Sequence, residues 1–155
     1  TLEWAKQQGA WLLTIALGRL ILGRALIIQK NDLSSARKWL NKAVAGLREL
    51  GAQHLLPLGL LARANLLREL NEYELAQQDL TEVWEIAEPS GMRLFMTDYH
   101  LEVARLLLKN PKHSSVKENK ASIAHHINAA ETLINETGYH RRDDELATLK
   151  NEYVH

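Results

Sequence analysis

The sequence predicts an all-α protein of about seven helices, arranged as antiparallel pairs that stack into an α-solenoid. Four glycines carry this prediction, because Gly9, Gly51, Gly91 and Gly138 are separated by 42, 40 and 47 residues and each follows an amphipathic helical pattern. No segment alternates with a period of two for long enough to indicate a strand. A repeat of this length in a helical chain is typical of solenoids, in which each helix pair packs on its neighbours.

The composition is that of a single globular domain. The chain has 155 residues, of which 46% are hydrophobic and 25% are charged, enough for one sizeable core. The net charge of +0 lacks the positive field that drives nonspecific binding of nucleic acids. The absence of cysteine excludes disulfides and thiolate metal sites and fits a reducing compartment, so we expect a cytoplasmic protein.

The apolar run Leu12–Ile28 allows two interpretations, a membrane span or a buried helix. A span needs roughly 20 apolar residues, whereas this run has 17 and contains Arg19 and Arg24. A central arginine costs about 2.5–3.5 kcal/mol on insertion scales. The run therefore favours a buried solenoid helix that is covered on both faces, and no membrane partner is expected.

The glycine positions divide the chain into repeats within one domain, residues 1–155. Gly9 is expected to end the tail of a helix whose beginning is missing, which indicates a fragment of a larger protein in which another repeat precedes this one. The predicted units are the helix tail 1–9, repeat 1 over 10–51, repeat 2 over 52–91, repeat 3 over 92–138 and a capping helix over 139–155.

Local signals place the helix ends within these repeats. Asn31-Asp32 breaks the first long helix, and Asp32 is a good N-cap for the next. Pro57 suits the first turn of a helix that starts near His54. Asn71-Glu72-Tyr73-Glu74 resembles an N-cap with a capping-box glutamate. The predicted core stripes of the second helices are Ala36, Leu40, Ala43 and Leu47; Ala76, Leu80, Val83 and Ala87; and Ile123, Ile127, Ala130 and Ile134.

The third repeat contains the longest expected loop. Its first helix runs from about Met92 to Lys109, and Asn110-Pro111 stops it because the residue before proline disfavours helix. A polar loop over 110–116 follows, and Ser115 with Glu118 forms a capping box for the next helix. After Gly138, a last helix with few apolar residues is expected to cover one end of the stack.

These residues resemble the tetratricopeptide repeat (TPR). Small residues stand at its first-helix position (Gly23, Ala64, Ala104), and its second-helix pattern is matched by Ala36-Leu40-Ala43, Ala76-Leu80-Val83 and Ile123-Ile127-Ala130. Asn31-Asp32-Leu33 and Asn71-Glu72-Tyr73 are similar to the family's turn. The early aromatic residue is absent, Val83 and Ile123 replace alanines, and the repeats exceed the family's 34 residues. The long helices look like the TPR arrays of bacterial STAND-class signalling ATPases and related transcription regulators.

The resemblance implies a right-handed superhelix whose first helices line a concave groove for a peptide or helix. The chain is thus expected to be a protein–protein interaction module, a scaffold or sensor segment of a larger signalling or regulatory protein. Arginine binds carboxylates with two prongs. Leu20 stands where the family's carboxylate clamps have lysine, so a terminal carboxylate is disfavoured. The groove candidates are Arg24, Asn65, Arg68, Asp98, Glu102, Arg105 and Lys109.

A structural role for the same residues is the alternative, in which Arg24 and Arg105 pair with acids such as Glu102 to hold repeats together. Nucleic-acid binding would require Arg19, Arg24, Arg63, Arg68 and Arg105 to share one face. A spacer without a ligand is the third possibility.

No catalytic, metal or cofactor site is expected. No two of the seven histidines stand three or four residues apart, as ligands on a helix would. His140 with Asp143 or Asp144 is interpreted as a solvated helix start rather than a metal site. Gly18 and Gly23 have the spacing of a phosphate loop, but Arg24-Ala25 replaces its Lys-Ser/Thr. The chain is therefore not expected to be an enzyme.

The aromatic and histidine residues give three packing predictions. Trp39 and Trp84 lie beside core stripes and are expected to pack between repeats. His126 should lie nearer the core than His125. Trp4 and Trp11 should expose apolar surface at the N-terminal end, through which the chain is expected to self-associate.

Overall fold

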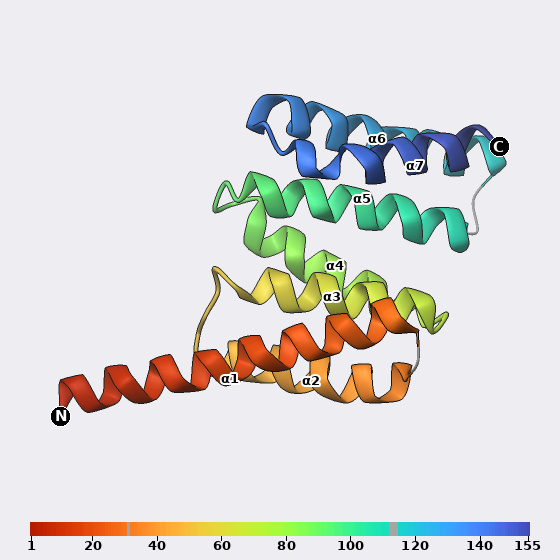
Figure 1. Cartoon of the computed structure of the whole chain (residues 1–155). Helices are drawn as coiled ribbons and strands as arrows, with labels where there is room; N and C mark the ends of the chain where they lie inside the picture. Colours follow the sequence, from red (N-terminus) through yellow and green to blue (C-terminus); the bar gives the residue numbers. More distant parts are fainter. Residues whose placement is uncertain (31, 112–114) are drawn as a thin grey trace.

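The protein is all-α. The computed structural model describes residues 1–30, 32–111 and 115–155, and in these ranges it contains seven α-helices, one short 3₁₀ helix and no strand. The predicted fold class and helix number are confirmed at this level (Figure 1). The helices are α1 (Leu2–Gln29), α2 (Leu33–Glu49), α3 (Leu56–Glu69), α4 (Tyr73–Ala87), α5 (Arg93–Lys109), α6 (Val116–Thr137), η1 (His140–Arg142) and α7 (Asp143–Val154).

Each helix packs against its neighbours in sequence. α1 packs on α2, α3 on α4 and α5 on α6, while α7 packs on both α6 and α5. The first helices of these pairs also contact one another, α1 with α3 and α3 with α5 (Figure 1). As a result, α1, α3, α5 and α7 form a consecutive series, and side chains from all of them can reach one surface.

The predicted second-helix stripes form the core. All twelve of their residues are buried, and Leu40, Leu47 and Leu80 are completely inaccessible to solvent. Gly23 permits the closest approach, because a Cβ at this position would lie 2.6 Å from the Leu40 Cγ atom. A side chain at position 23 would therefore push α1 away from α2.

Three of the four recurring glycines end helices as predicted. Gly51 and Gly91 both have φ of +64°, and Gly138 has φ of +74°. The Ala52 N–H donates to the Leu47 carbonyl at 3.0 Å, and the Met92 N–H donates to the Ala87 carbonyl at 2.9 Å. This six-to-one hydrogen bond is the Schellman motif, which requires a left-handed residue just after the helix.

Gly9 does not end a helix, and this prediction was wrong. α1 continues through it from Leu2, so residues 1–9 are the first turns of α1 rather than a separate tail. A glycine inside a helix costs only about 0.5–1 kcal/mol relative to alanine. The good helix formers on both sides of Gly9 outweigh that cost, and the argument for a preceding repeat from Gly9 does not hold.

Asn71 has a different role from the predicted one. It has φ of +61°, and the Glu72 N–H donates to the Leu67 carbonyl at 2.8 Å. Asn71 thus closes α3 in the way that Gly51 closes α2, because asparagine tolerates the left-handed region. α4 begins at Tyr73 without a side-chain cap, so the predicted capping box was wrong.

The other two predicted caps are confirmed. The Ser35 N–H donates to the Asp32 carboxylate at 2.9 Å, and Ser115 with Glu118 forms a reciprocal capping box. Asn31 of the predicted turn, and residues 112–114 of the predicted loop with His113 among them, lie outside the described residues.

α1 is not covered on both faces, contrary to the prediction. α2 and α3 contact one side of it, while Trp4 and Trp11 are each 66% exposed and Ile28 is 80% exposed. The first turns of α1 project beyond the other helices (Figure 1). Within the described chain, α1 is also the one helix long and apolar enough to span a membrane by length and composition.

The substitution Gly91→Ala is expected to lower the free energy of unfolding by about 1–2 kcal/mol, because alanine disfavours the left-handed backbone. Urea unfolding followed by circular dichroism measures this change. Gly9→Ala is the control, since neither glycine has an atom within 4 Å of a built Cβ. It should leave stability unchanged or raise it by up to about 1 kcal/mol, and equal losses in both variants would contradict the assignment of Gly91.

Candidate functional site

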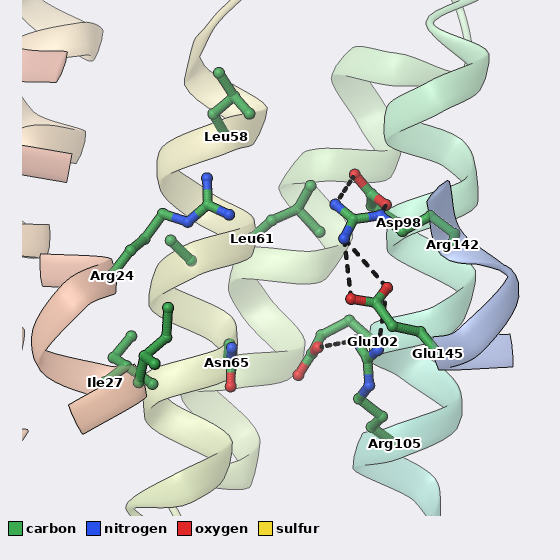
Figure 2. Close-up of a pocket in the computed structure, with 12 residues that line it drawn as sticks. Arg24, Ile27, Leu58, Leu61, Asn65, Asp98, Glu102, Arg105, Arg142 and Glu145 are labelled. Carbon is green, nitrogen blue, oxygen red and sulfur yellow. Dashed lines mark hydrogen bonds and ion pairs between the residues drawn. The ribbon is translucent and has the colours of Figure 1, made fainter. Parts of the chain in front are cut away.

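A cavity of about 180 Å³ lies where the series of first helices meets the C-terminal segment (Figure 2). Its floor is apolar on the α1 and α3 side, and its wall on the α5 and α7 side is charged. The lining residues are Arg24, Ile27 and Ile28 of α1, Leu58, Leu61, Ala62 and Asn65 of α3, Asp98, Glu102 and Arg105 of α5, Arg142 of η1, and Glu145 of α7.

The structure brings the predicted groove residues to one continuous surface. Five of them line this cavity: Arg24, Asn65, Asp98, Glu102 and Arg105. Arg68 and Lys109 line an adjoining hollow, and Arg105 and Glu145 line both. We call the two hollows together the groove.

Glu102 is the centre of the ion pairs between α3 and α5. Its carboxylate is 2.6 Å from the Arg68 Nε atom and 3.0 Å from the Arg105 Nη1 atom. Glu102 is 4% exposed and Arg68 is 9% exposed. Arg68 also donates to Glu69 at 2.7 Å and to the Asn65 side-chain oxygen at 2.9 Å. The Arg68–Glu102 pair joins α3 to α5, whereas Arg105 binds Glu102 from the same helix.

The C-terminal segment completes the charged wall through Arg142 and Glu145. Arg142 donates to Asp98 at 2.8 Å and to Glu145 at 3.0 Å (Figure 2). Glu145 also lies 3.5 Å from the Arg105 Nη2 atom. Sequence reasoning missed both residues, because their three-residue spacing at a helix start is explained equally well by dipole stabilisation.

Burial and ion pairing act in opposite directions on the pKa values of the groups in this charged wall. Burial raises the pKa of Asp98 above its ordinary value, although the charge of Arg142 acts in the other direction. Burial lowers the pKa of Arg142, but Asp98, Glu145 and Tyr139 together outweigh it, and the pKa is raised. The same holds for Arg68, where the effects of Glu102 and Glu69 together exceed that of burial. The acids beside Arg68 and Arg142 therefore favour the charged form of each guanidinium.

Arg24 differs from the other cations of the groove wall. It makes no hydrogen bond or ion pair with any residue in the described ranges, and its side chain is exposed. Figure 2 shows its guanidinium extending over the cavity from α1, on the side opposite Asp98 and Arg142. The structural alternative from the sequence therefore holds for Arg105 and not for Arg24.

Asn65 lies on α3 between Arg24 and the charged wall (Figure 2). Its side-chain oxygen accepts from Arg68, while its NH₂ group donates to no described residue. Arg24 and Asn65 thus offer donors to a ligand, and the apolar floor beside them is formed by Ile27, Leu58 and Leu61.

Three of the arginines that would favour nucleic-acid binding form ion pairs with acidic residues of the same chain. Arg63 donates two hydrogen bonds to Asp79, each 2.8 Å long. Arg68 and Arg105 are neutralised by the acids of the groove wall. Phosphate backbones are bound by unpaired cations, so these three residues do not supply such a surface.

A histidine and aromatic cluster joins α4, α5 and α6. The Nδ1 atoms of His100 and His126 are 2.9 Å apart, so one ring donates a proton and the other accepts it. The Trp84 ring lies 4.8 Å from Tyr99 and 5.2 Å from His100, which fits the predicted packing between repeats. His126 is half-buried and His125 exposed, as predicted. No described group of three or more histidines and acids is arranged to hold a metal ion.

Comparison of the chain with models of protein families, with curated proteins and with solved structures gives no match.

The substitution Arg142→Met is expected to lower the free energy of unfolding by about 2–4 kcal/mol, because it leaves the buried Asp98 carboxylate without its guanidinium partner. Adding Asp98→Asn to the same chain should restore part of the loss by removing the unpaired charge. Thermal and urea unfolding measure both changes. Arg141→Met at the exposed neighbouring position is the control, and a loss equal to that of Arg142→Met would contradict this role.

Acid should destabilise the fold through His100, which is 7% exposed. Burial, with the charges of His126 and His125, lowers the pKa of His100 from 6.5 to about 4. The unfolded chain therefore binds this proton first, and stability present above pH 6.5 is lost as the pH falls towards 4. The loss is up to about 3 kcal/mol.

Urea unfolding at pH 7 and pH 4.5 tests this expectation. His100→Gln should flatten the difference between the two pH values, whereas His54→Gln, at an exposed histidine, should leave it unchanged. An unaltered pH dependence in His100→Gln would show that other groups control acid stability.

Proposed function

We propose that this chain is a TPR-like, right-handed solenoid segment that binds a peptide or single helix of another protein in its groove. The observation that carries the proposal is the pair of donors, Arg24 and Asn65, which face a cavity with an apolar floor. The segment would serve as a scaffold or sensor part of a larger signalling or regulatory protein.

The packing order supports the solenoid part of the proposal. Contacts join helices that are neighbours or next-but-one in sequence, as in repeat proteins. Left-handed turns at Gly51 and Gly91, 40 residues apart, close corresponding helices with the same hydrogen bond. Ala64 and Ala104, at the TPR-like small position, are completely buried.

The groove chemistry supports a ligand that carries a carboxylate beside an apolar side chain. The guanidinium of Arg24 can bind a carboxylate with two prongs, and the Asn65 NH₂ group can donate to a ligand carbonyl. Ile27, Leu58 and Leu61 can receive an apolar side chain. Arg68, Asp98, Glu102, Arg105 and Lys109 have a supporting role, because they pair with one another or with Glu69, Arg142 and Glu145.

A displayed peptide library selected against the folded chain tests the proposal. Selected peptides should contain Asp or Glu next to Leu, Ile or Phe, and calorimetric titration should give micromolar dissociation constants. Arg24→Glu should weaken their binding at least tenfold, because it places a like charge beside the ligand carboxylate.

Arg19→Glu is the matched control, since Arg19 lies on the same helix and outside the cavity lining. It should leave binding unchanged. Selection that yields no peptide, or peptides bound equally well by Arg24→Glu, would favour a spacer without a ligand.

A further inference from the structure

The outer face of α1 is the largest apolar surface that the chain leaves uncovered. Among the described residues, eleven large hydrophobic side chains are exposed, and seven of them lie on α1. The other four are distributed over α4, α5, α6 and α7. Concentrated exposure of this kind marks an interaction surface, whereas isolated exposed residues do not.

Four of the exposed hydrophobic residues of α1 follow a heptad pattern, and the half-buried small residues Gly18 and Ala25 lie in the same pattern. Positions 4, 11, 18 and 25 recur every seven residues, and positions 21 and 28 stand three residues after the last two of these. They are Trp4, Trp11, Gly18, Ala25, Ile21 and Ile28, and we call them the α1 stripe. Residues at a and d positions of a heptad form the seam of paired helices.

The packing of its own chain does not require glycine at position 18. A Cβ at this position would meet no atom within 4 Å, whereas the Cβ of the nearby Gly23 would collide with Leu40. Thr14, one turn earlier, donates its hydroxyl to the Ala10 carbonyl at 2.9 Å and so satisfies that group within the helix. Gly18 in the stripe and Thr14 beside it are small residues that allow another helix to approach closely.

We propose that the α1 stripe pairs with the same stripe of a second copy of this chain, with the two helices antiparallel. If the two helices cross near residue 16 of each copy, Trp4 lies opposite Ile28, Trp11 lies opposite Ile21 and Thr14 lies opposite Gly18. Each tryptophan meets a smaller side chain, and the two small residues meet at the crossing. A parallel pair would set tryptophan against tryptophan and glycine against glycine.

The projecting turns of α1 agree with this orientation (Figure 1). A helical segment of only a few turns is marginal in water when no other helix packs on it. Trp4 lies on these projecting turns and is 66% exposed. In the antiparallel pair, the second copy's α1 lies along the projecting turns and covers them. In a parallel pair, the first turns of each copy would meet only each other.

The exposed area of the α1 stripe approaches what a small specific dimer buries. Two tryptophans at two-thirds exposure supply about 200–330 Å² per copy. Ile21 is 67% exposed and Ile28 is 80% exposed, so they add to this apolar area. The total approaches the roughly 600–1,000 Å² per partner of specific interfaces. A bilayer is disfavoured as the occupant, because the opposite face of α1 is packed on α2 and α3 and Arg19 and Arg24 lie within the apolar run.

Sedimentation velocity of the full chain over about 1–100 μM tests the pairing. A dimer is expected within this range. Trp11→Glu with Ile21→Glu should raise its dissociation constant at least tenfold, while Leu94→Glu, at an exposed leucine of α5, should not. Circular dichroism shows whether each variant is folded.

Gly18→Leu tests the same pairing without placing a charged side chain on α1. A Cβ at position 18 meets no atom within 4 Å in the monomer, and leucine favours helix, so the fold should be as stable as the wild type or more so. The dissociation constant of the dimer should nevertheless rise at least tenfold, because the helices are held apart at the crossing. A Gly18→Leu dimer of unchanged affinity would overturn the proposed seam.

Cysteine pairing reports the orientation, since the chain has no cysteine of its own. A mixture of Thr14→Cys and Gly18→Cys should form disulfide-linked heterodimers faster than either variant alone. Ready self-linking of Trp4→Cys would indicate a parallel pair and overturn the proposal. A wild type that stays monomeric at 100 μM, or that floats with phosphatidylcholine–phosphatidylglycerol vesicles as a monomer, would overturn it as well.

Discussion

A pair of these helices cannot bury its own apolar surface, and the rest of the structure depends on this constraint. The second helices present stripes such as Ala36, Leu40 and Leu47, which one partner helix covers only in part. Each pair therefore packs on the next, and the core is divided into successive clusters along the chain. α1 and α7 lie at the two ends of this packing order, and each contacts fewer helices than α3 or α5 does.

The two ends meet this constraint differently. α7 buries Leu146 and Leu149 against the last pair and presents polar residues outward, so it covers the apolar end. α1 instead carries apolar residues all round, and α2 and α3 cover only one side. Pairing with a second copy would give α1 the neighbour that its composition requires, and it would involve Ile28, which also lines the groove beside Arg24.

Stacking also determines the character of the groove. The first helices α1, α3 and α5 lie in series, so side chains that are far apart in sequence meet in one wall. There Glu102 is shared between Arg68 and Arg105, and Asp98 is paired with Arg142. Because these charges satisfy one another, the wall is a rigid support, and recognition depends on the few polar groups that remain unpaired.

Much of the fold was predictable because its signals are local. Helix class, the core stripes, the caps at Asp32 and Ser115 and the turns at Gly51, Gly91 and Gly138 each depend on a few neighbouring residues. Gly9 and Asn71 were misread, because glycine is tolerated inside a strong helix and asparagine can replace glycine after one. In both cases the local signal fits two conformations.

The sequence by itself determined the helices, their ends and the residues that could face a common groove, since periodicity and backbone preference act within a few turns. Only the tertiary structure decided which charges neutralise one another, that Arg142 and Glu145 join the wall, and that Arg24 stays unpaired. It also decided that one face of α1 is uncovered. The physical reason is that ion pairing and burial depend on distances between helices, which residue spacing along the chain does not specify.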